Sequence, residues 1–227
     1  MTVQSLIDKI RILLHDVDAI NWTDDELVGW LNDAQREISV YKPDVSVANE
    51  TISLEEGSKQ SLPDGGLTLI DAIRSMTSTG PGRAVKLVPR RILDAQRPDW
   101  HKQTPADEII GVCFDDRDQK TFYVWPPSTG AADSQLEIVY AKAPSDVTIE
   151  SAGISIDDTY STAIISYVAY RAYSKDSDYA ADDSRAASHY SHFTSLIGGK
   201  EAGERNMEAK TYIRRGNRSM SADGQQG

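Results

Sequence analysis

The spacing of apolar residues changes twice along the chain, and this change limits the possible fold more than any other feature. From about Val3 to Val17, apolar residues recur every three or four positions, which predicts an amphipathic helix. From about Val45 to Ile149, the apolar runs are short and β-type, and turn residues separate them. Helical spacing returns near Ile156. We therefore expect an α+β fold, with a helical bundle built from both chain ends, an inserted β module and an extended C-terminal arm.

A capping motif and an apolar stripe predict a second helix that Pro43 ends. Thr23 is followed three residues later by Glu26, a spacing at which the two residues can cap each other's backbone amides. The stripes of this helix and of the later ones contain residues that we assign to the helix core or to a subunit interface. They are Leu27, Trp30, Leu31, Ile164, Val168, Tyr190 and Phe193.

Two more helices are expected toward the end of the chain. Asp157 or Asp158 is the expected cap of the first of them. The other is expected from about Asp178, and the pair Gly198-Gly199 is a typical stop signal for its end.

The middle of the chain is predicted to form strands and one helical turn. The expected strands are Glu50–Leu54, Gly57–Leu62, Leu67–Met76, Ala84–Val88, Ile109–Phe114, Thr121–Trp125 and Gln135–Tyr140. Turns are expected at Pro63-Asp64-Gly65-Gly66, Gly80-Pro81-Gly82 and Pro126-Pro127, and a helical turn at Pro89–Ala95. The predicted domain organisation is therefore a helical body from residues 1–44 and 151–199, a β insertion from 45–150, and an arm from 200–227.

Charge and cysteine content exclude several classes of function. The formal net charge of -11 opposes tight binding to phosphate backbones, because that affinity depends on Lys and Arg. Cys113 is the single cysteine, which excludes an internal disulfide and a cysteine-based zinc site. The N-terminus lacks a cationic segment followed by an apolar run, and no stretch is long and apolar enough to span a bilayer. We therefore expect no membrane association.

Three stretches together resemble the head-to-tail adaptor family of short-tailed and related phages. The first is Trp22-Thr23-Asp24-Asp25-Glu26-Leu27 followed by residues 30–38. The second joins Gly57–Pro63, Leu69-Ile70-Asp71 and Arg91–Asp94 with residues 118–127. The third is the helix end with His189-Tyr190, Phe193, Leu196 and Gly198, and the charged tail after it. The order and spacing of all three stretches carry the resemblance, because each alone is common.

The resemblance implies a structural protein and no enzyme or cofactor. It implies a ring, of twelve copies, that binds the portal protein and the tail proteins of the nozzle or tail tube. Such a ring lies at the neck of the virion, is assembled in the host cytoplasm, and lets DNA pass without specific binding. The alternatives are another neck or tail-completion protein, and a tail-borne cell-wall hydrolase that works with two carboxylates.

The arm after residue 199 is predicted to contact the portal. It contains six basic and four acidic side chains, so its charge is opposite to that of the rest of the chain. We assign portal binding to the cluster Tyr212, Ile213, Arg214 and Arg215, which combines apolar area with bidentate donors. Contact of its arginines with DNA in the channel is the alternative.

Other residues have a chemical and a structural interpretation, and we favour the structural one for each. Asp115, Asp116 and Asp118 could bind calcium, but they lack the spacing of a calcium loop and fit a polar hairpin turn. His189 and His192 could share a metal, but no carboxylate stands at a matching spacing.

Cys113 and the four tryptophans also have a chemical and a structural interpretation. Cys113 lies in an apolar run, which favours a buried and inert thiol over a nucleophile. Trp22, Trp30, Trp100 and Trp125 could stack on sugars or bases, but core or interface packing is favoured.

Overall fold

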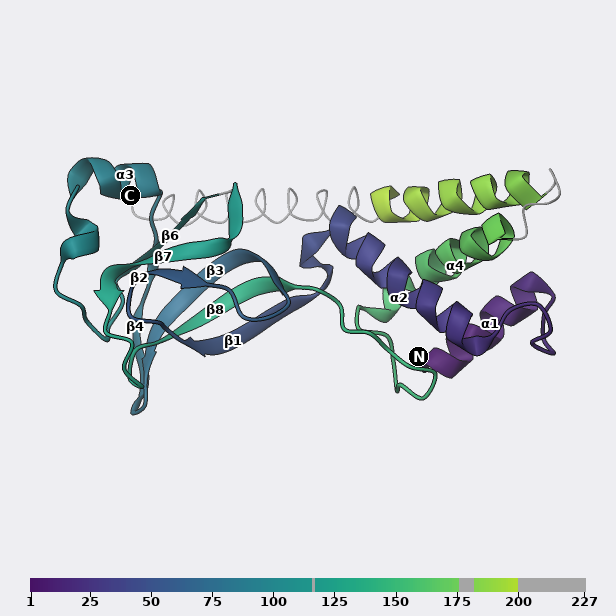
Figure 1. Ribbon diagram of the computed structural model, residues 1–227, viewed down its shortest axis with the longest axis horizontal. Helices are drawn as coiled ribbons and strands as arrows, with labels where there is room; N and C mark the ends of the chain where they lie inside the picture. Colours follow the sequence, from purple (N-terminus) through teal and green to yellow (C-terminus); the bar gives the residue numbers. More distant parts are fainter. Residues whose placement is uncertain (116, 176–181, 200–227) are drawn as a thin grey trace, which may run out of the picture. The chain divides into compact units, whose positions relative to one another are not determined.

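The computed structural model describes residues 1–115, 117–175 and 182–199 (Figure 1). The fold is α+β, as the sequence predicts. It contains helices and two four-stranded sheets. The chain divides into two compact units. One, the helical unit, contains Met1–Glu37 and the chain from Asp146 onward, and the other, the β unit, is Ile38–Ser145.

The first helix, α1, spans Val3–Leu14 and is shorter than predicted. Its cap is Thr2, whose side chain accepts a hydrogen bond from the backbone N–H of Ser5. The helix ends because His15 adopts the left-handed conformation, with φ 55°. Val17, expected on the buried stripe, is instead 67% exposed. The apolar spacing of the sequence therefore continues past the point at which the backbone turns away.

The second helix, α2, spans Asp24–Tyr41 and begins with the predicted capping motif. The N–H of Thr23 donates to Glu26 Oε2 at 3.2 Å, and the N–H of Glu26 donates to Thr23 Oγ1 at 3.3 Å. The three-residue helix η1, Pro43–Val45, follows, so Pro43 ends α2 as expected.

Replacement of Thr23 tests this cap. We expect Thr23→Ala to lower the free energy of unfolding by about 1 kcal/mol, because one amide of the first turn loses its acceptor. Thr23→Ser keeps the acceptor and is expected to melt like the parent protein. Equal melting of the Ala and Ser variants in a calorimeter would show that the capping bonds contribute nothing.

The third predicted helix begins with a short turn and continues as α4. Asp157 accepts from the N–H of Thr159 at 2.8 Å and caps η3, Asp158–Tyr160, which leads into α4, Ser161–Lys175. Residues 182–199 are helical. Both Gly198 and Gly199 are still helical, so the predicted stop at these glycines is wrong. The expected start of this helix near Asp178 lies outside the described residues.

Apolar side chains of four helical segments form the core of the helical unit. Helix 182–199 contacts α4 through aromatic rings, with centroids 5.1 Å apart for Tyr167 and Phe193 and 4.9 Å apart for Tyr170 and Tyr190. The buried side chains of α1, α2 and α4 include Leu6, Ile7, Ile10, Leu27, Leu31, Ile164, Val168 and Ala172.

The β unit contains two four-stranded sheets. One sheet has the order β1 (Val47–Ser53), β8 (Gln135–Lys142), β3 (Gly66–Thr77) and β4 (Gly80–Ala84). The other has the order β2 (Gly57–Ser61), β7 (Asp118–Ser128), β6 (Gly111–Asp115) and β5 (Lys86–Leu87). Neighbouring strands are antiparallel except for β5 and β6.

Two of the predicted turns are wrong, and two are confirmed. Residues Gly80–Gly82 begin strand β4, and Pro126-Pro127 lie within β7. The turn at 63–66 is confirmed, since the N–H of Gly66 donates to the carbonyl of Pro63 at 2.9 Å and Gly65 has a φ of +79°. The polar hairpin turn is also confirmed, because Asp115 pairs with Asp118 where β6 meets β7, although Asp116 is outside the described residues.

The β6–β7 sheet is apolar on both faces. Val112 and Phe122 point into a core shared with Leu136, Ile138 and Tyr140 of the other sheet. The neighbouring residue Cys113 points to the opposite face, where it contacts a smaller cluster. That cluster contains Leu93 of helix α3, Arg90–Gln96, and Trp100 of the turn η2, Trp100–Lys102. The helical turn predicted at residues 89–95 is thus a short helix covering this sheet.

Candidate assembly surfaces

A buried carboxylate shapes the loop between α1 and α2. Asp16 Oδ1 accepts hydrogen bonds from the N–H groups of Ile20 at 2.9 Å and Asn21 at 3.0 Å. Its Oδ2 accepts from the N–H of Trp22 at 3.2 Å. One side chain therefore satisfies three backbone donors of a loop that has no secondary structure of its own.

Arg11, on the last turn of α1, completes this network from the helix side. Its guanidinium donates to Asp16 Oδ2 at 3.1 Å, to the carbonyl of Trp22 at 3.1 Å, and to the carboxylate of Asp24. The side chains of Arg11 and Asp16 are 8% and 2% exposed. Burial by itself raises the pKa of Asp16, but the amides of Asn21, Trp22 and Ile20 and the charge of Arg11 together hold it below its ordinary value. Asp16 is therefore ionised at neutral pH.

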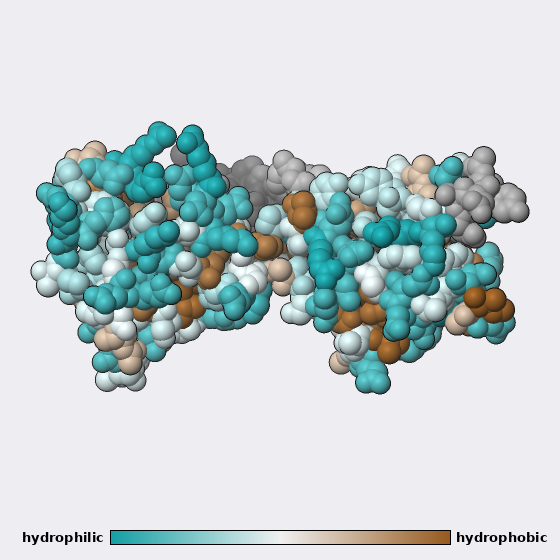
Figure 2. Space-filling model, viewed as in Figure 1, coloured by the Kyte–Doolittle hydropathy of each residue, from teal (hydrophilic) through white to brown (hydrophobic). Residues whose placement is uncertain are grey.

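The loop built on this network presents apolar side chains to solvent. Val17 and Ile20 are 67% and 81% exposed, and Ile12 on the adjacent turn of α1 is 64% exposed. His15 and Ala19 both have a φ of 55°, a region that costs energy for residues with a Cβ. Figure 2 shows apolar surface on this unit among mostly hydrophilic side chains. We call Ile12, Val17 and Ile20 the apolar knob.

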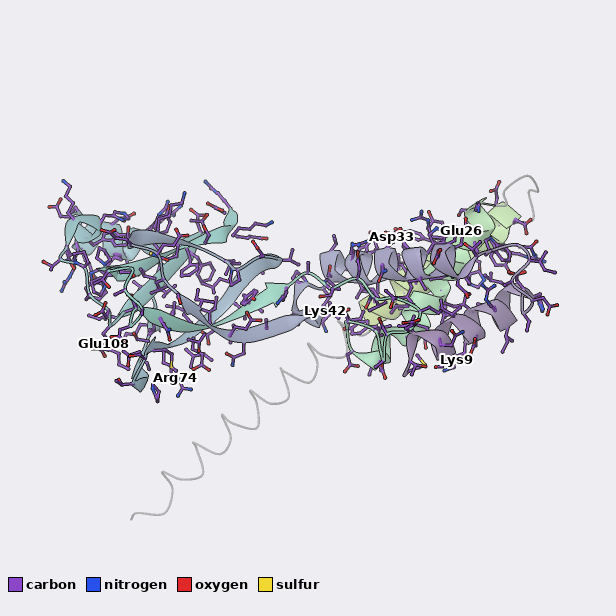
Figure 3. All side chains as sticks on the ribbon, turned by 60° about the horizontal axis from the view of Figure 1, so that its bottom comes forward. Lys9, Glu26, Asp33, Lys42, Arg74 and Glu108 are labelled. Carbon is purple, nitrogen blue, oxygen red and sulfur yellow. The ribbon has the colours of Figure 1, made fainter. Side chains whose placement is uncertain are left out.

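Two ion pairs join α2 to α4. Glu26 and Asp33 lie along one side of α2, as Figure 3 shows. Glu26 pairs with Lys175, and Asp33 pairs with Arg171 at 3.3 Å. The hydrogen bond from Lys175 is the main cause of the lowered pKa of Glu26.

The remaining surface of the helical unit is strongly acidic. Over residues 1–37, 146–175 and 182–199 there are fourteen Asp and Glu against six Lys and Arg. Five of these six bases already pair with acids of the same unit, namely Arg11, Arg36, Arg171, Lys175 and Arg185. A surface of this kind repels DNA phosphates.

The residues assigned to the core or to an interface fall into two groups. Leu27, Leu31, Ile164, Val168 and Phe193 are 0% exposed and belong to the core of the helical unit. Trp30 and Tyr190 are half-buried. Trp30 lines a shallow pocket of about 390 Å³ together with Glu26, Arg171, Ser174 and Lys175. The four residues assigned to portal binding, Tyr212, Ile213, Arg214 and Arg215, lie outside the described residues.

The residues with possible metal chemistry do not form a metal site in the described part of the chain. No group of three His, Cys, Asp or Glu residues among the described ones could hold a metal ion. His189 stacks on Tyr173 with ring centroids 5.6 Å apart. Burial lowers the pKa of His189, and the neighbouring His192 lowers it further.

The Cys113 thiol is buried, as predicted. Burial raises its pKa to about 11, and the charge of Asp94 acts in the same direction, while Arg90 lowers it. The thiol is therefore protonated at neutral pH and is a poor nucleophile.

A serine and a histidine meet at the surface of the β unit without the rest of a hydrolytic site. Ser58 Oγ lies 2.8 Å from His101 Nδ1, and His101 stacks on Trp100. Among the described residues, no carboxylate hydrogen bond to the other ring nitrogen orients this histidine, as a triad needs. The pKa values of Asp16, Glu26 and Asp133 are each held below their ordinary values, opposite to what a general acid needs.

Two polar clusters could not be found from the sequence. The Asp16 network depends on a loop whose course no local motif predicts. The second cluster joins α2 to the segment after the β unit. Asn32 exchanges hydrogen bonds with the backbone of Val147 at 3.0 and 2.9 Å, and Gln35 accepts from the N–H of Ser155 at 2.6 Å. The residues in each bond are more than 100 positions apart.

The chain matches the model of a known protein family. The model of a protein family described as SU10 adaptor protein matches residues 1–218. No curated protein matches the chain. Within the described residues, the helices are too short or too polar to cross a membrane.

Proposed function

The chain belongs to the SU10 adaptor protein family, a family of phage head-to-tail adaptors, and we propose that it forms a ring of twelve copies between portal and tail. The match covers residues 1–218, so both units and most of the predicted arm belong to the family pattern. This coverage is the single observation that carries the proposal. Membership implies a structural role at the neck of the virion and contact with portal and tail proteins.

The surface of the helical unit supports a role in assembly. Exposed apolar patches mark interaction sites, and the hydrogen bonds of Asp16 hold the backbone of the loop that carries Val17 and Ile20. A surface that is ordered before binding loses less conformational entropy when it docks. We propose that the helices form a bundle that is the body of the subunit and that the knob is part of a protein interface.

We further propose that the ring leaves a channel through which DNA passes without specific binding. The support is electrostatic. The acidic excess of the helical unit and the internal pairing of its bases leave few cations for phosphates. A slow band with duplex DNA at physiological salt that disappears at high salt would refute this part of the proposal.

Purified portal rings provide the direct test. We expect the protein to co-sediment with portal rings and to appear in electron micrographs as an added ring with twelve-fold symmetry. Absence of binding to the portal of the same phage, together with turnover of peptidoglycan, would instead identify a tail-borne hydrolase. Binding only to tail proteins would identify another neck or tail-completion component.

The arm is proposed to bind the portal through Tyr212, Ile213, Arg214 and Arg215. We expect a chain that ends at residue 199 to melt at the parent temperature and to bind portal rings about tenfold more weakly, because interface energy is concentrated in a few anchors. The matched control is Arg205→Ala with Lys210→Ala, which removes charge outside the cluster. Equal portal binding by the truncated and full chains would show that the arm is passive.

A further inference from the structure

A hollow beside α3 gathers three arginines on the β unit. Its volume is about 440 Å³. It lies where the start of α3 meets the turn between β6 and β7, elements labelled in Figure 1. Its lining consists of Pro89, Arg90, Arg91, Phe114, Asp115 and Arg117.

The arginines of this hollow differ in how they are paired. Arg90 contacts Asp115 at 3.4 Å and Asp94 at 3.7 Å, so carboxylates of the same unit neutralise it. Arg91 and Arg117 are exposed, and neither has an ion pair with a residue that the structure describes. This contrasts with the helical unit, where five basic side chains are paired internally. Two guanidinium groups at the hollow are thus available to an external carboxylate.

The frame of the hollow is fixed by packing and hydrogen bonds. Trp100 Nε1 donates to Asp94 at 2.9 Å, which ties α3 to the buried cluster of Leu93, Trp100 and Cys113. On the opposite side, the N–H of Arg117 donates to Asp115 Oδ1 at 3.1 Å. These bonds fix α3 on one side of the hollow and the turn residues Asp115 and Arg117 on the other.

Exposed apolar side chains accompany these charges. Leu87 on β5 and Ile92 on α3 are 43% and 47% exposed. Ile92 follows the lining residue Arg91, and Leu87 stands two residues before the lining residue Pro89. Within the lining itself, Pro89 and Phe114 supply apolar area beside Arg91 and Arg117, which have no ion pair with a described residue.

The loop between α1 and α2 combines exposed apolar area with negative charge. Val17 and Ile20 supply exposed apolar area, and Asp18 lies between them. Asp18 and Asp25 are both exposed, and neither has an ion pair with a described residue. We call residues 17–26 the acidic corner.

We propose that the acidic corner of one copy docks onto the arginine hollow of the next copy. This inference rests on the proposed ring, because the two complementary surfaces lie on different parts of the same chain. Such an interface is heterologous, and repetition of a heterologous contact generates a ring when the rotation closes. Carboxylates of Asp18 and Asp25 pair with Arg91 and Arg117, and Val17 and Ile20 cover apolar area near Ile92.

A second copy fits the hollow better than DNA does. The carboxylates of Asp94 and Asp115 pair with Arg90, so Arg91 and Arg117 are the two guanidinium groups of the hollow that have no ion pair with a described residue. The β unit as a whole has fifteen acidic and twelve basic residues, so its formal net charge is negative. Affinity for duplex DNA requires several neutralised phosphates.

Charge reversal and its rescue test the contact. We expect Arg91→Glu with Arg117→Glu to lower the number of chains retained per portal ring, with affinity between copies reduced about tenfold or more, because like charges then face each other. Adding Asp18→Lys and Asp25→Lys to the same chain restores opposite charges and is expected to restore retention. The matched control, Lys59→Glu with Arg83→Glu, makes the same change in net charge at exposed positions outside the lining.

The outcomes separate this inference from the proposed function. If the parent protein does not bind portal rings at all, the proposed function fails. If the parent binds and the reversed variant binds equally well, or if the fourfold variant shows no rescue, the docking inference is overturned.

A crosslinking experiment identifies the occupant of the hollow. Arg91→Lys places an amine there, and a zero-length amine-to-carboxylate reagent is applied to rings assembled from a mixture of isotopically light and heavy chains. Mixed-isotope crosslinks from position 91 to Asp18 or Asp25 support the proposal. Crosslinks from this position to portal peptides, or weaker binding of the reversed variant to duplex DNA than the parent shows, would overturn it.

Discussion

Asp16→Ala is expected to destabilise the helical unit by roughly 3–5 kcal/mol, the usual cost of leaving a buried charge without its partner. The substitution removes the acceptor for three backbone N–H groups and leaves Arg11 buried with less compensation. Thermal unfolding of the full chain measures the loss. Asp18→Ala, two residues away on the exposed part of the loop, is the matched control and is expected to change stability by less than about 0.5 kcal/mol.

Hydrogen exchange distinguishes loss of the loop from general unfolding. In the parent, the amides of Ile20, Asn21 and Trp22 donate hydrogen bonds to the carboxylate, so they are expected to exchange slowly. In Asp16→Ala they are expected to exchange rapidly while the amides of α2 stay protected. Unchanged exchange at these three positions would show that the carboxylate does not hold the loop.

The same network predicts the direction of a pH effect. The pKa of Asp16 in the folded protein lies below its ordinary value of 3.8. As pH falls, the unfolded chain therefore takes up the proton first, so the stabilisation is complete above pH 3.8 and is lost as pH falls through the lower folded-state value. Asp16→Asn lacks this contribution, and its stability is expected to fall less steeply than that of the parent below pH 3.8. Parallel curves would contradict the assignment.

Trp100→Ala is expected to cost the β unit about 3–5 kcal/mol, the range for removal of a large buried aromatic side chain. Trp100 is 0% exposed, stacks on His101 with centroids 3.6 Å apart, and meets Tyr123 edge-on at 6.3 Å. Its indole also donates to Asp94 on α3. Chemical denaturation of the full chain, followed by a signal from the β unit, measures the loss.

Trp100→Phe separates packing from hydrogen bonding. Phenylalanine keeps most of the apolar area but cannot donate to Asp94, so its cost is expected to be clearly smaller than that of alanine. In the alanine variant, α3 is expected to detach from the sheet, which also displaces Arg90 and Arg91 from the hollow. A Trp100→Ala protein that melts like the parent would show that the small cluster contributes nothing.

Local patterns in the sequence predicted elements whose signals are themselves local. Thr23 and Glu26 are three residues apart, so their reciprocal hydrogen bonds follow from one turn of helix. The alternation of Val112 and Cys113 likewise follows from the two-residue period of a strand. The end of α1 was missed because it depends on the backbone of His15, and apolar spacing contains no information about a left-handed residue.

The candidate surfaces depend on long-range placement and could be predicted only in part. The sequence shows a helical turn at residues 89–95 and a turn near Asp115, but not that the two lie together at one hollow. It shows Asp16 as one acidic residue among many, without its three amide donors. Family resemblance identified the adaptor class because it uses order and spacing along the whole chain.

The division of the chain into a β unit and a helical unit sets the order in which the two can fold during translation. The β unit is one continuous stretch, Ile38–Ser145, and can fold as soon as it leaves the ribosome. The helical unit needs α4 and Val147, which emerge more than 100 residues after Asn32, on the order of ten seconds later at bacterial rates. Until then the apolar stripes of α1 and α2 lack their partners. A nascent chain interrupted before α4 therefore keeps these stripes exposed and is prone to aggregate.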